Sequence, residues 1–451
     1  MGVMDAETQL QANIEQWRGY VQRHRAISIA DVDEMEDHLR EQVSSLQDAG
    51  LDADEAFLVA VKRMGSLDAL SREFALEHSE RLWKQLVLVP AEADTTGRQR
   101  NRELVVVLAL AVGAALSLKA GFAWLHGSAV GVNAALLVLP FLAAYFAWKR
   151  QVTARVAIAL AVPFVLVALV LNLYPFEPEG ATEVIAAIHA PIALWFVIGL
   201  AYVGGDWRSD RRRMDFIRFT GEWFVYLTLL ALGGGVLIGL TVGAFGTLDL
   251  DIEPVIEDWV LPFGVAGAVI VAAWLVEAKQ NVVENIAPVL TRVFTPLTIL
   301  MLVALLAAFA TTRSVIDVDR TLLILMDLIL VLVLGLLLYS ISARDPLAPP
   351  GFFDRVQLVL VLCALAVDVV MLTAMLTRIA EFGSSPNKVV ALGLNVVLLV
   401  NLAWSVRLGL GFLRGRAGFA DLERWQTRYL PVYGVWAAFV VVTVPPVFDF
   451  V

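Results

Sequence analysis

The sequence predicts an all-α fold, a polytopic helical membrane protein with a small helical bundle before its first span. Three observations lead to this prediction. Of the 451 residues only 17% are charged, whereas a soluble domain has about 25%. From about residue 103 onward, apolar runs of about 20 residues follow one another, and this is the length at which a helix crosses a bilayer. Residues 1–89 instead carry nine Lys and Arg and seventeen Asp and Glu, as a water-facing domain would.

Residues 1–89 are expected to form a soluble, acidic helical domain. Apolar side chains recur at helical spacing over about residues 5–24, 31–49, 52–64 and from 66 onward, which predicts four helices. Nine positive and seventeen negative groups give this region a net charge of −8. Nucleic acid is therefore not expected as a partner, because phosphate contacts require a basic face.

Charged residues gather on the second of these helices. They form either a metal-binding or partner-binding surface or an ordinary solvated helix face, and we favour the solvated face. The residues are Glu34, Glu36, Asp37, His38 and Glu41.

Three short motifs give this region a family resemblance. They are Glu34-Met-Glu-Asp-His-Leu39, Gly50-Leu-Asp-Ala-Asp-Glu-Ala-Phe57 and Met64-Gly-Ser-Leu67. Together they resemble the permease-prefix, or HAAS-type, domain that precedes many bacterial membrane proteins, over about residues 10–80. The resemblance implies a cytoplasmic regulatory or docking module without catalysis, so a cytoplasmic protein partner is expected to bind through residues 1–89.

Residues 90–102 form a polar, turn-rich linker that ends in Arg98, Arg100 and Arg102, directly before the first span. Lys and Arg beside membrane spans stay on the cytoplasmic side. The N-terminus is therefore expected in the cytoplasm.

Residues 103–451 are expected to form a transmembrane domain of about eleven helices, with lipid as their surroundings. The last of these spans is short. The expected spans are about 103–125, 129–148, 153–174, 183–204, 217–245, 257–276, 293–311, 321–342, 356–379, 388–411 and 431–447.

The distribution of charge supports this number of spans. The loop Asp206–Arg218 carries five arginines, and the flanks that alternation assigns to the cytoplasm carry twenty Lys and Arg in all, whereas the outer flanks carry four. We therefore expect a multi-pass protein of the bacterial cell (inner) membrane with its C-terminus outside. Two helices on the inner face are expected not to cross the bilayer: 413–430, with Phe419, Leu422 and Trp425 on one side, and 280–292.

A second resemblance concerns about residues 290–410. Phe294-Thr-Pro-Leu297 and the loop Arg378-Ile-Ala-Glu-Phe-Gly-Ser-Ser-Pro-Asn-Lys388 resemble the polytopic family known as domain of unknown function number 4153. Phe382, Ser384 and Lys388 stand where that family usually has Tyr, Thr and Arg. The family implies no known reaction.

Polar residues inside spans are candidates for function, because a charge in hydrocarbon is costly. Asp368 lies near the middle of the ninth span, and Asp327 and Arg378 lie toward outer ends, where they could pair. With Asn395 and Asn401 on the tenth span, they form either a proton- or cation-coupled site or a set of interhelical hydrogen bonds, and we favour the hydrogen bonds.

Two further features within spans favour packing over function. His189 in the fourth span is expected to be a hydrogen-bonded packing residue. Gly235, Gly239 and Gly243 in the fifth span are four residues apart, which predicts a stripe for close helix contact, with a broken helix lining a transport site as the alternative.

No nucleotide-binding, metal-binding or nucleophile motif occurs, and the single cysteine, Cys363, excludes a disulfide within the chain. We therefore expect no enzyme, no catalytic residue, no metal and no cofactor. The favoured function is a regulatory or sensory membrane protein whose head docks a partner. The alternative is a secondary transporter or channel with intramembrane carboxylates in its pathway, and a lipid-modifying enzyme is the least favoured. A homo-oligomer is left open.

Overall fold

The computed structural model describes residues 10, 11, 13–15, 29–48, 51–63, 94–247, 250–278, 286–312, 320–346 and 348–451. These residues form helices and connecting turns, and none of them lies in a strand. The chain divides into two compact units, Met1–Arg98 and Gln99–Val451. The all-α prediction is therefore confirmed for the described part of the chain.

In the first unit, two helices share a small apolar core. Helix α2 spans Ile29–Asp48 and α3 spans Ala53–Arg63. The Asp52 side chain accepts a hydrogen bond of 2.8 Å from the Glu55 amide, which caps the start of α3. The buried residues are Ile14, Leu39, Val43, Leu46, Ala56 and Ala60. The helix predicted from residue 66 onward and most of the one predicted at 5–24 lie outside the described residues.

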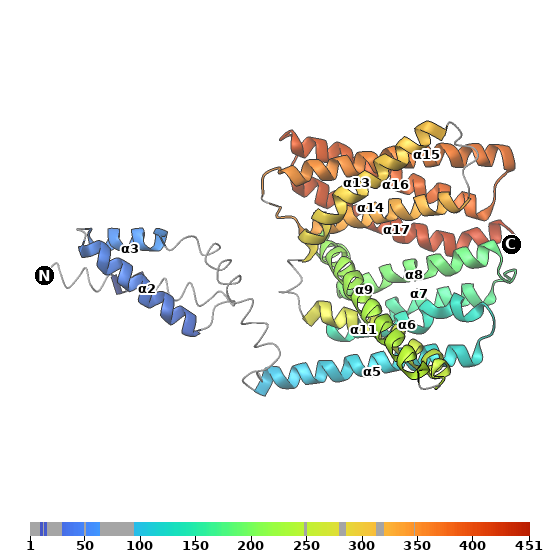
Figure 1. Ribbon diagram of the computed structural model, residues 1–451, viewed down its shortest axis with the longest axis horizontal. Coiled ribbons are helices and arrows are strands. Elements are labelled where there is room, and N and C mark those ends of the chain that lie inside the picture. The colour runs from blue at the N-terminus through green and yellow to red at the C-terminus, as the bar shows by residue number, and fades with distance from the viewer. Residues whose placement is uncertain are drawn as a thin grey trace. The chain divides into compact units, whose positions relative to one another are not determined.

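Among the described residues of the second unit, eleven helices are long and apolar enough to cross a membrane, in agreement with the predicted number. Figure 1 shows how they are arranged. The sixth consists of α10 (Glu253–Val255), a π-helical turn (Ile256–Val260) and α11 (Leu261–Ala278). The others are α5 (Asp94–Trp124), α6 (Ala129–Lys149), α7 (Ala154–Leu173), α8 (Ala181–Tyr202), α9 (Asp210–Gly246), α13 (Ile286–Thr312), α14 (Arg320–Ala343), α15 (Phe352–Phe382), α16 (Pro386–Leu413) and α17 (Phe419–Val447).

The expected interfacial helix at 413–430 is wrong. Residues 419–447 form one helix, α17, which continues through Pro431. Its apolar face packs inside the bundle instead of on a bilayer surface: the Phe412 and Phe419 rings lie 5.6 Å apart, and Tyr429 Oη donates to the Val397 carbonyl of α16 at 2.8 Å. An amphipathic pattern alone does not distinguish these two environments.

Two other boundaries differ from those expected. Helix α5 begins at Asp94, so most of the expected linker 90–102 is helical. Helix α13 begins at Ile286 and includes Pro288, so the described part of the segment 280–292 is the start of a helix that goes on to span the membrane from Leu290. Proline is tolerated there because the first turn of a helix leaves its N–H groups without helical partners.

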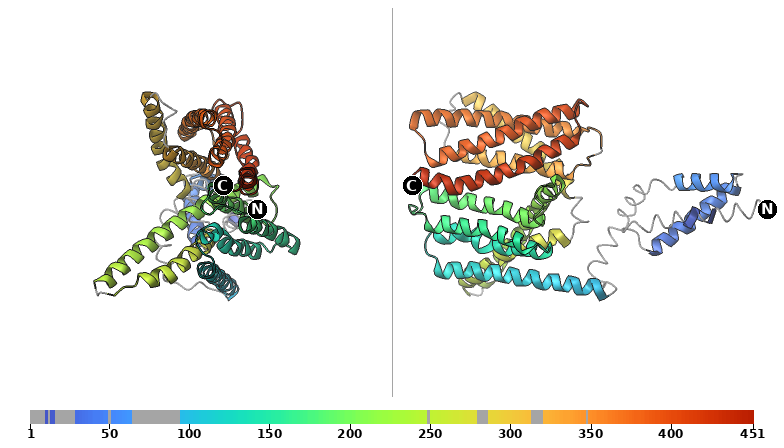
Figure 2. Two further views of the ribbon diagram at one scale, coloured as in Figure 1. Left: turned by 90° about the vertical axis from the view of Figure 1, so that its right-hand side faces the viewer. Right: turned by 180° about the vertical axis from the view of Figure 1, so that it is seen from behind.

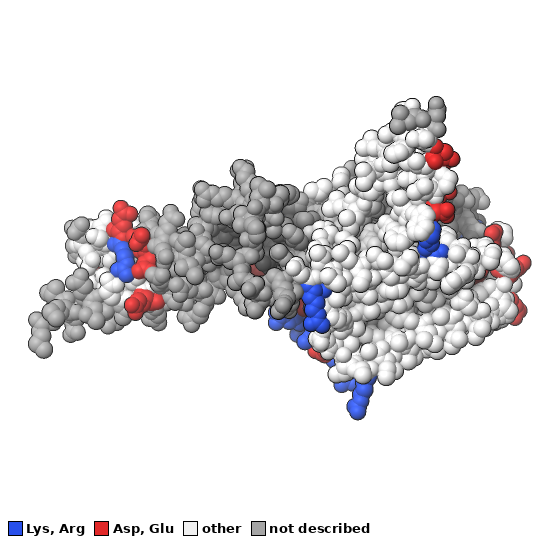
Figure 3. All heavy atoms as spheres, turned by 90° about the horizontal axis from the view of Figure 1, so that it is seen from below, with Lys and Arg blue, Asp and Glu red and all other residues white. Residues whose placement is uncertain are grey.

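The connections between spans fall at two ends of the bundle. At one end, Ser128 Oγ donates to Glu183 Oε1 at 3.0 Å and the Glu177 amide donates to the Phe450 carbonyl at 3.0 Å. At the other end, Arg150 Nε donates to the Tyr202 carbonyl at 2.9 Å. Most of the basic side chains visible on the membrane unit lie at this second end and most of the acidic ones toward the first (Figure 3). We call them the basic end and the acidic end.

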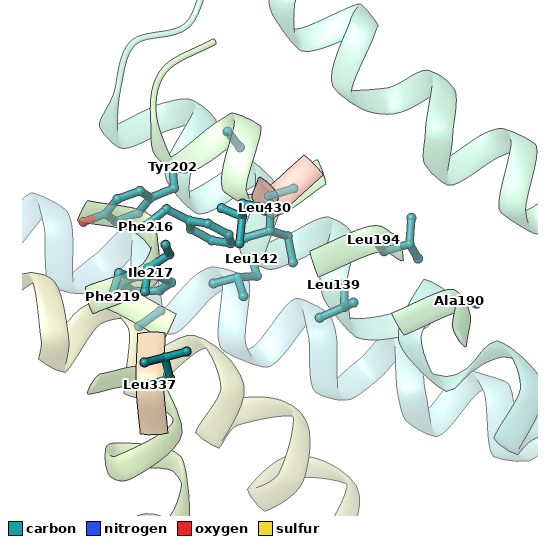
Figure 4. Packing of buried hydrophobic residues seen from close by; sticks show 14 of the residues in the cluster. Leu139, Leu142, Ala190, Leu194, Tyr202, Phe216, Ile217, Phe219, Leu337 and Leu430 are labelled. Carbon is teal, nitrogen blue, oxygen red and sulfur yellow. The ribbon is translucent and has the colours of Figure 1, made fainter. Parts of the chain in front are cut away.

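The packing around α6, α8 and α9 is aromatic near the basic end. Phe219 of α9 stacks on Tyr202 of α8 with ring centroids 4.6 Å apart and meets Phe146 of α6 edge-on at 5.2 Å (Figure 4). Such pairs stabilise by about 0.5–1.5 kcal/mol beyond area burial. They fix the N-terminal half of α9 against its neighbours.

Among the described residues, the glycine stripe of α9 meets no other helix closely. A Cβ atom at Gly235, Gly239 or Gly243 would have no other atom within 4 Å. This half of α9 lies with α11 in an arm that projects from the other helices (Figure 2, left). The close approach occurs elsewhere, at Gly393 of α16, where a Cβ would lie 1.9 Å from the Trp436 ring of α17.

We expect Gly393→Val to destabilise the fold by about 1–3 kcal/mol or more, because the Trp436 ring occupies the space that the new side chain needs. Thermal unfolding of the purified protein in detergent measures the effect. The same substitution at Gly239, where a Cβ meets nothing within 4 Å, serves as the matched control. Equal unfolding temperatures for the two variants would contradict this account of α16–α17 packing.

We also expect reporters fused after Glu179 and after Asp210 to report opposite compartments. Glu179 lies at the acidic end, before α8, and Asp210 at the basic end, at the start of α9. Pairs of fusions whose reporters are active on only one side of the membrane test this. Activity of both on one side would refute the alternation of the spans.

Candidate functional site

Three helices of the second unit bring two carboxyl groups and one amide together. Asp368 of α15 and Asn395 of α16 are completely buried, at 0% exposure, and Asp327 of α14 is partly buried. Asp368 is buried because it lies on the face of α15 that also carries Leu360, Ala364 and Met371. We call Asp327, Asp368 and Asn395 the carboxyl–amide cluster.

Asn395 connects the cluster through its amide group. Its Nδ2 atom donates to Asp327 Oδ1 at 2.9 Å and to the Ala391 carbonyl at 2.8 Å, so both amide hydrogens have acceptors. Asp327 therefore bonds to α16. The expected pairing of Asp327 with Arg378 is not among the contacts described for Asp327, whose side chain bonds to Asn395 of α16.

The acceptor atoms of the cluster are incompletely satisfied. Both carboxyl oxygens of Asp368 and the Oδ1 atom of Asn395 are buried without a hydrogen-bond partner among the described residues. The Asp327 carboxyl group is close enough to act electrostatically on Asp368. An ionised carboxylate held there without a donor would cost several kcal/mol, and a like-charged neighbour adds to this. The cluster therefore fits a proton or a cation better than bare negative charge.

Asn401, also completely buried, belongs to a different and closed network between α16 and α17. Its Nδ2 donates to Gln426 Oε1 at 2.9 Å, and Gln426 Nε2 donates to Ser405 Oγ at 2.7 Å. Ser405 Oγ in turn donates to the Asn401 carbonyl at 2.7 Å. This geometry matches the packing interpretation, since a buried side-chain network that links two helices fixes how they pack.

His189 of α8 is partly buried, and its Nδ1 lies 2.9 Å from the Ile185 carbonyl one turn earlier. A ring nitrogen that bonds its own helix is the arrangement expected of a packing histidine. Neither His189 nor Asn401 is joined to the carboxyl–amide cluster by the contacts described.

Sequence reasoning missed a buried charge network at the basic end. The Glu277 side chain of α11 is 2% exposed and lies 3.2 Å from Lys149 and 2.9 Å from Arg150. Lys149 also pairs with Glu103 of α5 at 2.7 Å, so the network ties α5, α6 and α11 together. The sequence did contain a clue to this network. A single glutamate follows the apolar run Val269–Val276, and two basic residues follow the second span, so an ion pair between the two span ends could have been predicted. Gln426 was missed because its segment was assigned to the bilayer surface.

A small cavity lies between α14, α15, α16 and α17 near the basic end. Its volume is about 30 Å³, and Gln357, Ser405, Phe412 and Phe419 line part of it. A cavity must offer about 10–15 Å³ to hold one water molecule, so this cavity has room for one or two. Asp368 does not line it.

The described residues contain no group of three or more His, Cys, Asp or Glu that could hold a metal ion. Comparison with family models, with curated proteins and with solved structures finds no match.

Proposed function

We propose that this is a regulatory or sensory membrane protein whose membrane unit holds a proton between Asp368 and Asn395. The observation behind the proposal is the set of three buried acceptor atoms without a donor, two on Asp368 and one on Asn395. Other buried polar atoms, such as Thr182 Oγ1 and Tyr433 Oη, also lack a partner among the described residues, but here three unmet acceptors belong to one cluster with a second carboxyl group, which supports binding at this place.

A proton fits this set better than a metal cation. A protonated Asp368 supplies one O–H donor, and the proposal places it against Asn395 Oδ1, an acceptor without a donor among the described residues. Cations such as Ca²⁺ instead need about six to eight oxygen ligands. The cluster provides three unpaired oxygens and the Asp327 carboxyl group, which is too few.

The sealed position of Asp368 supports sensing over passage. Its exposure is 0% and the described cavity lies apart from it, so the group does not line a pathway in this state. Loss of the proton would leave a buried carboxylate beside Asp327. That costs several kcal/mol, enough to shift the contact of α14 and α15 with α16 between two arrangements. The proposed signal is this shift.

The N-terminal unit supplies the output in this proposal. Residues 1–89 carry the permease-prefix resemblance and a net charge of −8, nine positive against seventeen negative groups, which suits docking of a cytoplasmic protein. The charge asymmetry of the spans supports a cytoplasmic head and basic end, with the C-terminus outside the cell membrane. The resemblance to the family of unknown function number 4153 adds no reaction.

A secondary transporter or channel is the second candidate, and one observation favours it. The cavity is lined by Gln357 and Ser405, and these lie on α15 and α16, the helices that carry Asp368 and Asn395. A rearrangement that extended the cavity along these two helices would connect the basic end with the cluster.

We expect the infrared spectrum of the purified protein at neutral pH to contain the carbonyl band of a buried protonated carboxylic acid. Asp368→Asn should remove this band, because the proton is placed on Asp368. Asp327→Asn should leave it, because Asp327 is the acceptor of the Asn395 amide. Asp251→Asn, a change at an exposed carboxylate, is the control.

A band that survives Asp368→Asn, or is lost only in Asp327→Asn, would refute the assignment of the proton to Asp368. In sealed liposomes, protein-dependent proton or solute flux that Asp368→Asn abolishes would favour the transporter over the sensor.

For the head, we expect the intact protein to retain a cytoplasmic protein on affinity purification that a variant lacking residues 1–89 does not. The acidic surface and the resemblance are the reasons for this expectation. Comparison of the two co-purified sets by mass spectrometry provides the measurement, and identical sets would count against docking by the head.

A further inference from the structure

One stripe of α16 faces outward between Val396 and Arg407. Val396, Val400 and Trp404 are 46%, 47% and 41% exposed, and Arg407 continues the stripe as an exposed residue. The apolar side chains of Val396, Val400 and Trp404 suit a surface that faces lipid. An arginine at the end of such a stripe needs a partner there, because a guanidinium in hydrocarbon is costly.

The Arg407 side chain is held in place by aromatic rings. Its guanidinium carbon lies 4.6 Å from the centre of the Trp404 ring. Trp404 meets Trp425 of α17 at 5.5 Å, and Trp425 meets Tyr429 at 5.1 Å. This ladder fixes the guanidinium by its face, and no hydrogen bond or ion pair among the described residues occupies its N–H groups.

The depth of Arg407 suits the phosphate layer of a bilayer. Helix α16 has 28 residues, about 42 Å of helix, against about 30 Å of hydrocarbon. Arg407 lies six residues before Leu413, about 9 Å from the helix end. Its long side chain reaches the lipid headgroups from that position.

The surroundings of Arg407 carry an excess of positive charge. Residues 407–428 contain five arginines and two acidic residues, and one of the acids, Asp421, already pairs with Arg424 at 3.5 Å. Arg414 and Arg416 are exposed in the turn that follows α16. A negatively charged headgroup would be favoured over a zwitterionic one at such a place.

We propose that Arg407, Trp404 and the arginines that follow α16 form a binding site for the phosphate of an anionic phospholipid in the leaflet at the basic end. The guanidinium binds the phosphate oxygens in the paired geometry that arginine favours. The aromatic ladder between α16 and α17 lies beside the acyl chains. The site is separate from the carboxyl–amide cluster and does not depend on the function proposed for it.

Native mass spectrometry of the full chain, delipidated in detergent and titrated with phosphatidylglycerol, tests the proposal. Arg407→Gln should weaken binding of this lipid about tenfold, the loss expected for one charge-assisted contact. Arg355→Gln, which removes an equally exposed arginine from the basic end of α15, is the matched control and should change binding little. Trp404→Leu should weaken binding as well, because it removes the ring that holds the guanidinium.

Two further titrations identify the ligand. Phosphatidylcholine should bind more weakly than phosphatidylglycerol, and inorganic phosphate at equal concentration should not displace the bound lipid. Equal loss in Arg407→Gln and Arg355→Gln would show non-specific charge attraction and overturn the proposal. Equal binding of the two lipids, or displacement by inorganic phosphate, would overturn the assignment to an anionic lipid.

Discussion

The rest of the structure depends on one constraint, that a bilayer offers no water to a polar group. Helices satisfy the backbone, and side chains must find partners among themselves. Glu277 is 2% exposed and has two cations within 3.2 Å, and the amide of Asn401 closes a loop with Gln426 and Ser405. Glu277 joins α11 to the end of α6, which is distant in the sequence, and Asn401 joins the consecutive helices α16 and α17, so the need to satisfy polar groups also organises the bundle.

Close packing is the second determinant, because lipid tails are as apolar as the helices and supply no hydrophobic force between them. Trp436 lies over Gly393 where α16 and α17 meet, and Tyr339 lies over Gly221 where α14 and α9 meet. In both places a large ring covers a bare backbone. The glycines of the α9 stripe have no such ring opposite them, although their spacing is the one usually associated with helix contact.

The sequence was sufficient for the helical class and the number of spans, since both follow from apolar length and alternation of charge. It also pointed to Asp327, Asp368 and Asn395 through their rarity in hydrocarbon. It could not give partners: it suggested Arg378 for Asp327, whereas the described bond of Asp327 goes to Asn395, because helix rotation decides which face meets which neighbour. The segment 413–430 was misplaced for the same reason, since an apolar stripe packs equally well on lipid or on another helix.

Whether a buried polar group has a hydrogen-bond partner distinguishes residues that burial alone does not. Asn395 and Asn401 lie on one helix and are both at 0% exposure, so neither type nor depth tells them apart. The Asn401 side chain forms hydrogen bonds with Gln426 and Ser405. Asn395 Oδ1 and both carboxyl oxygens of Asp368 have no hydrogen-bond partner among the described residues. If Asp368 served only for packing, an apolar residue in its place would leave the packing intact and would avoid the free-energy cost of burying a carboxyl group. This cost is the physical argument behind the proton proposed for Asp368.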